Sequence, residues 1–356
     1  MFSRAAAGLM IVAYIGQVWA SCAYGTILHP RAEGGKVEVG KFGYIGTTGP
    51  ANWVALDAAN ALCANGTNQS PINMLSGRFS AIPAAGLSLD IPDMTEGTSF
   101  ENLGTTVEVV AKGGQMSFGG VNYTLQQFHF HLPSEHLNNG ASTAMEMHMV
   151  LEGGAGEVGV IGVFIDINDK SEAVPSVPPA SPRATPSITS SSTPEAVPSD
   201  KAAAKPRSAS REMRARRQTT QRQIENNSSL PALKVQGTFF HVNAPTTAAM
   251  TPSALLENVF GSVGEIATPG TVTKTRPLVM SELVNTLLSG SFQTYEGSLT
   301  SPPCSEGVRW FVSNQVLSIQ PETFTKARSV IGFNARFPQN ELGTENLLSQ
   351  RLLAGR

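Results

Sequence analysis

The chain has 356 residues, of which 41% are hydrophobic and 15% charged, and its formal net charge is −2. This apolar content suffices for a sizeable core, so the composition excludes a wholly disordered or fibrous protein. Eight of the 25 basic residues fall within residues 201–222 beside a single acid, which leaves the rest of the chain at −9. An acidic folded surface of this kind argues against a nucleic-acid-binding protein.

The N-terminus has the pattern of a secretory signal peptide. Arg4 precedes an apolar run from Ala5 to Val18, and small residues follow the run. The run is shorter than the ~20 residues of a membrane span. We therefore expect residues 1–23 to be removed from a secreted, extracellular or periplasmic protein. The alternatives are an uncleaved anchor or a buried N-terminal helix.

Glycosylation sequons agree with a secretory route. The pattern Asn-x-Ser/Thr occurs at Asn65, Asn68, Asn122, Asn226 and Asn227. Such sites are usable only in a secreted chain, so they indicate a glycoprotein.

The three cysteines fit the same interpretation. Cys22 would leave with the signal peptide, so that Cys63 and Cys304 remain as an even pair. In a secreted chain such a pair indicates one disulfide bond that closes a very long loop. The alternative is two unrelated buried thiols.

The first part of the domain, residues 24–168, is predicted to consist mainly of strands. A helix is expected over Trp53–Cys63. Apolar residues alternate over Thr105–Val110 and Tyr123–His131, and a β-branched run covers Val158–Ile167.

Residues 169–230 form a compositional break, rich in proline and serine at first and basic later. Such a segment cannot bury enough apolar surface to offset its ordering entropy, so we expect a disordered insert. Within it, Arg214–Arg217 resembles a site for secretory processing proteases. A solvated basic linker is the alternative, and a nuclear or nucleic-acid patch conflicts with the signal peptide.

Residues 231–356 are expected to fold together with residues 24–168 as one domain. Helices are predicted over Ser253–Phe260 and Ser281–Leu288. The fold class is α+β and mostly β, with a large central, mainly antiparallel twisted sheet and short surface helices.

Histidines cluster at the end of the second predicted strand and just after it. His129 and His131 are two residues apart, so on a strand they project from the same face. A turn at Asn138-Asn139-Gly140 lets the chain return antiparallel, which places His148 opposite the pair and Glu146 beside it. Three neutral imidazoles with a fourth position left for water are typical of a catalytic zinc site.

A cupin metal site is the minority alternative. It would use Glu135 as a fourth ligand to the His129–His131 pair, together with a histidine far downstream. The glycines and the later Pro-x-Gly-x-x-His pattern that such a site needs are missing from this sequence.

Taken in order, these blocks resemble the α-class carbonic anhydrases, in the secreted form, over the chain outside the signal peptide and the insert. The matching segments are Phe42–Tyr44, Trp53, Gln69–Asn73, Gln127–His131, Ser134–His136, Glu146–Val150, Val158–Phe164, Gly297–Cys304 and Val308–Trp310. Carbonic anhydrase is itself the standard example of a catalytic zinc site built from three histidines.

The resemblance implies a zinc enzyme that hydrates carbon dioxide reversibly to bicarbonate and a proton. Zn²⁺ would be held by His129, His131 and His148, and zinc-bound hydroxide would attack CO₂. Thr300 would accept the hydrogen bond of the hydroxide, and Glu135 would fix the direction of the Thr300 hydroxyl.

Further residues take roles by the same resemblance. Gln127, Glu146 and His136 would lie behind the ligands and orient them. The substrate pocket would be lined by Val150, Val160, Leu299, Val308, Trp310 and Ser301, although ordinary core packing explains the five apolar residues equally well. Cys63 and Cys304 match the disulfide of secreted and bacterial members.

One position departs from the family pattern. Thr105 stands where fast members carry a histidine that shuttles protons, and a hydroxyl cannot exchange a proton near neutral pH. We therefore expect slower or buffer-dependent hydration.

A binding module is the second class of function. Carbonic anhydrase-like domains without zinc ligands bind partners, and the insert could serve one. Here all three ligand positions are histidine, and Glu135 and Thr300 are both present. This set favours the enzyme.

Overall fold

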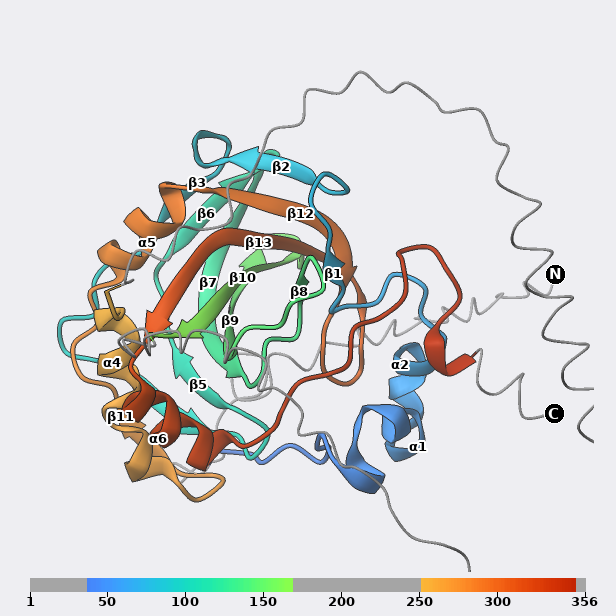
Figure 1. Ribbon diagram of the computed structural model, residues 1–356, viewed down its shortest axis with the longest axis horizontal. Coiled ribbons are helices and arrows are strands. Elements are labelled where there is room, and N and C mark those ends of the chain that lie inside the picture. The colour runs from blue at the N-terminus through green and yellow to red at the C-terminus, as the bar shows by residue number, and fades with distance from the viewer. Residues whose placement is uncertain (1–36, 169–250, 350–356) are drawn as a thin grey trace, which may run out of the picture. The chain divides into compact units, whose positions relative to one another are not determined.

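The computed structural model describes residues 37–168 and 251–349 (Figure 1). The predicted signal peptide, residues 1–23, and the predicted insert, residues 169–230 with Arg214–Arg217, lie outside these ranges. Within them, no helix is long and apolar enough to cross a membrane.

Strands dominate the described part of the chain. They are β1 (Asn73–Met74), β2 (Ser80–Pro83), β3 (Ser88–Asp90), β4 (Ser99–Asn102), β5 (Val107–Val110), β6 (Gln115–Phe118), β7 (Val121–His131), β8 (Leu137–Asn138), β9 (Met145–Gly153), β10 (Val158–Ile167), β11 (Val272–Lys274), β12 (Ser291–Ser298) and β13 (Glu306–Ile319). In the described ranges, eleven strands form one sheet. Nine of them follow the order β11-β4-β5-β7-β9-β10-β13-β12-β2, and of the other two β6 pairs with β7 and β3 with β6.

The sheet is mainly antiparallel, as predicted. In the described ranges its one parallel pair is β10 with β13, which brings together the two parts of the chain that flank the predicted insert. The long strands β7, β9, β10 and β13 are neighbours at the centre of the sheet, and Figure 1 shows them side by side. This fold class is the one expected from the sequence.

The helices are short. They are α1 (Trp53–Leu56), α2 (Leu62–Asn65), α4 (Ala254–Phe260), α5 (Met280–Leu288) and α6 (Pro321–Ile331), with 3₁₀ turns at Gly46–Thr48, Pro50–Asn52, Ala58–Ala61, Ala84–Gly86 and Val263–Ile266. In Figure 1, α4, α5 and α6 lie on one side of the sheet, away from α1 and α2.

Two helices agree with the predictions and two regions differ. Helices α4 and α5 lie where they were expected. The predicted helix over Trp53–Cys63 is broken, because Asp57 is extended (φ −156°) and its carboxylate accepts the N–H of Ala59, which starts a new 3₁₀ turn. Helix α6 was not predicted, although it begins with Pro321 and ends before Gly332 at φ 70°.

The central strands bury side chains on both faces. On one face, Phe128 and Phe130 of β7 and Met145, Met147 and Met149 of β9 join the large apolar core. The intervening residues of the same strands point the opposite way. One face of the sheet is therefore filled by aromatic and methionine side chains, and the other is left for the histidines.

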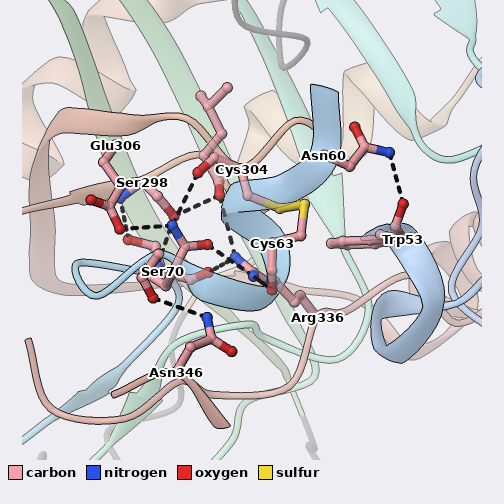
Figure 2. Close-up of a disulfide and its surroundings, with 12 residues drawn as sticks. Trp53, Asn60, Cys63, Ser70, Ser298, Cys304, Glu306, Arg336 and Asn346 are labelled. Atoms are coloured by element: carbon pink, nitrogen blue, oxygen red, sulfur yellow. Dashed lines mark hydrogen bonds between the residues drawn. A yellow bond between two sulfur atoms is a disulfide. The ribbon is translucent and has the colours of Figure 1, made fainter. Parts of the chain in front are cut away.

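The predicted disulfide between Cys63 and Cys304 is confirmed. The two sulfur atoms are bonded, and both cysteines are fully buried against Trp53. The bond joins α2 to the loop between β12 and β13 across 241 residues of sequence (Figure 2).

Removing this cross-link should destabilise the protein strongly. In the chain-entropy model a loop of 241 residues is worth about 5–6 kcal/mol, because the bond restricts the unfolded chain. We expect a Cys63→Ser/Cys304→Ser variant to lose about this much free energy of unfolding, measured by urea denaturation. A loss below about 1 kcal/mol would contradict the prediction.

Candidate metal centre and active site

The pairing of β7 with β9 brings the three histidines together. Their antiparallel register sets His129 directly opposite His148, and His131 opposite Glu146. Successive side chains of a strand point to opposite faces of the sheet. The face opposite the methionine core therefore carries His129, His131, Glu146 and His148. The three imidazoles are nearly fully buried, with at most 5% of any residue exposed.

A bulge in β7 completes this face. The register with β9 shifts between Leu125 and Gln127, so Leu125 packs in the core while Gln127 lies on the histidine side. An unbulged strand would give both residues the same face. The bulge therefore turns Leu125 into the core, while Gln127 stays on the same face as His129, two residues further along the strand.

A glycine in the neighbouring strand β10 leaves room for the Glu146 carboxylate. Gly162 pairs with His148, and a Cβ at this position would lie 3.1 Å from Glu146 Oε1. A side chain there would crowd the carboxylate, so the glycine is required by close packing and not by backbone conformation.

Each of the three imidazoles is fixed by a hydrogen bond at one ring nitrogen. Gln127 Oε1 lies 2.9 Å from His129 Nδ1, and Glu146 Oε1 lies 2.8 Å from His148 Nε2. The third, His131 Nδ1, lies 2.9 Å from the backbone carbonyl oxygen of Asn334. Because these oxygens accept, the nitrogens named must carry the protons, and the other nitrogen of each ring keeps its lone pair.

These lone pairs suit a metal ion. One ligand nitrogen from each of His129, His131 and His148 lies within 4.8 Å of the other two. His131 Nε2 is buried without a hydrogen-bond partner, and a buried polar atom in that state is costly unless something binds it. Burial lowers the pKa of all three imidazoles, that of His131 to about 4, so they are neutral at physiological pH.

The donor set points to zinc rather than to a harder cation. Neutral imidazoles suit Zn²⁺, whereas Mg²⁺ and Ca²⁺ prefer oxygen ligands. Three protein ligands, as opposed to four, are typical of catalytic zinc sites. The residues present therefore fit the predicted metal.

Glu146 anchors a second cluster behind the histidines. Its Oε1 also lies 2.7 Å from His136 Nδ1, and its Oε2 accepts the backbone N–H groups of Glu135 and His136. Burial alone would raise the pKa of Glu146, but His136 and His148 hold it well below its usual 4.5. Although His136, Glu146 and His148 also converge within metal-binding distance, their facing atoms bind one another, so they form a support and not a second metal site.

This support extends to a tyrosine. His136 Nε2 lies 2.7 Å from the Tyr295 hydroxyl, which in turn lies 2.8 Å from Ser70 Oγ. Since His136 Nδ1 donates to Glu146, the Tyr295 hydroxyl donates to His136. A continuous chain of hydrogen bonds thus links His148 to Ser70 through groups that are all buried.

Glu135 and Thr300 lie together at the edge of the site. Both residues are almost fully buried, and Glu135 Oε1 accepts the backbone N–H of Arg336 at 2.7 Å. Burial raises the pKa of Glu135 to about 7, against the opposing effects of His148, of the hydrogen bond from the Thr300 hydroxyl and of the Arg336 N–H. A cation held by the nearby histidines would favour the ionised carboxylate further.

The predicted pocket residues fall into two places. Val150, Val160, Leu299, Val308 and Trp310 share one apolar cluster on the histidine face of the sheet. Ser301 instead lines the cavity into which His129 and His131 open. The other residues that line it are Thr105, Thr106, Leu103, Phe42, Tyr44, Gly40, Glu38 and Glu108. None of the five apolar residues lines that cavity.

Several residues of the site were not predicted. Asn334 and Arg336 follow α6 without a recognisable pattern, and Asn334 contributes a backbone oxygen that any residue could offer. Tyr295 lies on β12, where its spacing gives no sign of a partner 159 residues away. Glu108 pairs with His129 across β5 and β7. Glu108 lies on the predicted strand Thr105–Val110, so pairing of this strand with Tyr123–His131 could have indicated that it lies near His129.

The sequence matches a known protein family. Residues 48–175 and 209–352 match the family described as eukaryotic-type carbonic anhydrase. The chain belongs to this family. Residues 176–208 lie between the two matched stretches, inside the predicted insert.

Individual carbonic anhydrases show how far the similarity extends. One from Pectobacterium atrosepticum is 25% identical over 291 residues, covering 82% of this chain and 83% of the relative. Alpha carbonic anhydrase 6 of Arabidopsis thaliana is 33% identical, and the chain spans 48% of its length. For the Neisseria gonorrhoeae enzyme the identity is 38% and the spanned length 42%, so the chain matches about half of these two relatives.

Solved structures share the fold. A fungal alpha carbonic anhydrase from Aspergillus oryzae is 28% identical, with a TM-score of 0.63, and the match covers 88% of this chain and 99% of that one. The α-carbonic anhydrase of Thermovibrio ammonificans superposes with a TM-score of 0.56 at 24% identity, which bears on the fold alone.

The carboxylate behind His148 should control zinc affinity. In Glu146→Gln the NH₂ group that replaces Oε2 would face the backbone N–H groups of Glu135 and His136, donor against donor. The side chain must therefore shift, and its oxygen no longer holds His148 in the metal-binding tautomer. We expect zinc to bind about 10–100-fold more weakly, measured by competition with a chromophoric chelator. The matched control is Glu296→Gln, which changes a carboxylate in an exposed salt bridge with Arg309. This variant should bind zinc as the unmodified protein does. Equal affinities in the two variants would contradict the role given to Glu146.

Proposed function

We propose that this protein is a zinc enzyme that hydrates carbon dioxide reversibly to bicarbonate and a proton. The observation that carries the proposal is the set of three buried, neutral imidazoles whose free lone pairs converge, with the Glu135–Thr300 pair beside them. When bound, Zn²⁺ supplies a Lewis acid that makes water acidic enough to lose a proton near neutral pH. Membership of the carbonic anhydrase family supports the same reaction.

The protein's own groups would hold and orient the reactants. His129, His131 and His148 would hold the metal, and their hydrogen-bonded nitrogens keep the rings from rotating. The Thr300 hydroxyl would donate a hydrogen bond to Glu135, whose pKa it lowers, so the lone pairs of Thr300 Oγ1 would be the ones left to accept a hydrogen bond from water. A water held in this way presents its own lone pair to the substrate.

The apolar cluster supports a site for an apolar substrate as the wall behind the imidazoles. Its Trp310 ring lies 4.8 Å from the ring of His148, and none of its five predicted residues lines the cavity of His129 and His131. Val150, Val160, Leu299, Val308 and Trp310 are each at most 7% exposed. Carbon dioxide has no net dipole, so it gains from leaving water for such a surface, whereas charged bicarbonate does not. This difference would favour release of the product.

We also propose that the protein is exported and that residues 24–168 and 231–356 form one catalytic domain around a disordered insert. The Cys63–Cys304 bond supports export, since disulfides persist in oxidising compartments. The pairing of β10 with β13 supports a single domain. Glycosylation and processing at Arg214–Arg217 would follow from the same route.

Loss of zinc should abolish the activity. We expect CO₂ hydration, followed by the pH change in a stopped-flow instrument, to vanish after treatment with a zinc chelator and to return when Zn²⁺ is added back. A His131→Ala variant should be inactive, because it removes a ligand whose nitrogen has no other partner. Hydration that survives both changes would overturn the proposal.

Proton release should limit the rate. Thr105 lines the cavity beside His129 and His131, and its hydroxyl does not titrate near neutral pH. We expect turnover to rise with the concentration of imidazole buffer and to saturate. Thr105→His should raise turnover in dilute buffer at least about tenfold, whereas Thr105→Ser, which adds no titratable group, should not. Equal turnover in dilute and concentrated buffer would contradict this.

A further inference from the structure

Arg336 is a cation buried at the junction of several chain segments. Only 2% of the residue is exposed. One end nitrogen of its guanidinium donates to the carbonyl oxygen of Ser70 at 2.6 Å, and the other donates to Gln69 Oε1 at 2.9 Å and to the Cys63 carbonyl oxygen at 3.3 Å. The Trp53 ring lies 5.7 Å from the guanidinium carbon. Figure 2 shows the group beside the disulfide.

These contacts use features that only arginine offers. Its acceptors here are neutral oxygens on different segments, and the planar fork reaches them together, which a lysine ammonium cannot do. Burying a cation is costly unless it is hydrogen-bonded. Apolar side chains could hold these segments together without the desolvation cost of a buried charge. The presence of an arginine here therefore indicates a role beyond stability.

Two further contacts connect Arg336 with the reaction site. Its guanidinium lies 3.5 Å from the carbonyl oxygen of Leu299, the residue that precedes Thr300. Its backbone N–H donates to Glu135 Oε1 at 2.7 Å. One residue therefore contacts both Glu135 and the backbone that carries the Thr300 hydroxyl.

We propose that Arg336 is a positioning residue, whose guanidinium fixes the Thr300 backbone relative to the Glu135 carboxylate. The inference rests on the proposed function, because it assigns a role within that reaction. With the guanidinium bound to Ser70, Gln69 and Leu299, the Arg336 main chain and the Thr300 loop share one rigid support. Without it, each is free to shift separately.

The metal ligands do not share this dependence. Asn334, whose carbonyl oxygen holds His131, is anchored by its own side chain to the backbone of Thr105, Phe130 and Leu132. Loss of the guanidinium should therefore leave zinc binding intact while it disturbs the Glu135–Thr300 pair. A displacement of about 1 Å at such a pair costs up to about a hundredfold in rate.

The test uses the full chain with zinc bound. For Arg336→Lys and Arg336→Gln we expect kcat for CO₂ hydration to fall at least about tenfold, with one zinc retained per chain. The control is Asn346→Ala. Asn346 is buried near the same disulfide, and its side chain hydrogen-bonds to the backbone of Gly66 and Leu348 rather than to Leu299 or Glu135. This control should lower Tm and keep kcat.

A double-mutant cycle separates positioning from general stability. In a Thr300→Ala background the hydroxyl is gone, so Arg336→Lys should cost little further activity. An equal loss in both backgrounds, or unchanged kcat in zinc-loaded Arg336→Gln, would overturn the proposal. If neither Arg336 variant folds, Gln69→Ala keeps the arginine but removes one acceptor, and unchanged kcat in that variant would also overturn it.

The two proposals fail in different ways. An unmodified protein with no zinc-dependent hydration would refute the proposed function itself. An active unmodified protein whose Arg336 variants match it would refute the positioning role alone.

Discussion

The antiparallel register of β7 with β9 is the constraint on which the site depends. It sets His129 against His148 and keeps Phe128 and Phe130 in the core. A slip by one residue would exchange the two faces and bury imidazoles where aromatic rings belong. The apolar core on one face therefore specifies the cluster of three histidines on the other.

The two described parts of the chain contribute different residues to the site. The part before residue 168 supplies the three imidazoles, Gln127 and Glu146, which together make a binding site for a metal. The part after residue 251 supplies Asn334 and Arg336, whose backbone groups hydrogen-bond to His131 and Glu135, and Thr300, which lowers the pKa of Glu135. The disulfide and the parallel pairing of β10 with β13 join the two parts.

Sequence patterns predicted what is local or repetitive. The spacing of His129 and His131 and the following turn were sufficient to bring in His148, because strand geometry has a period of two. The oxygen that holds His131 could not be predicted, since it belongs to the backbone of Asn334, far along the chain. Likewise the helix over Trp53–Cys63 was expected from apolar spacing, and the side chain of Asp57 breaks it. Helix α6 was missed because the two residues it buries, Thr323 and Ala327, are small and one is polar, so its sequence shows little apolar periodicity.

The separation between His131 and Arg336 also sets an order of events during synthesis. At ribosomal rates of about 5–20 residues per second, His131 is made roughly 10–40 s before Asn334, whose carbonyl oxygen holds it. Gln127 and Glu146, which hold the other two imidazoles, are made together with them. A growing chain thus offers imidazoles to passing cations while the carbonyl of Asn334 does not yet exist. The ring nitrogen of His131 that carries the proton is therefore fixed only once the segment after α6 is in place.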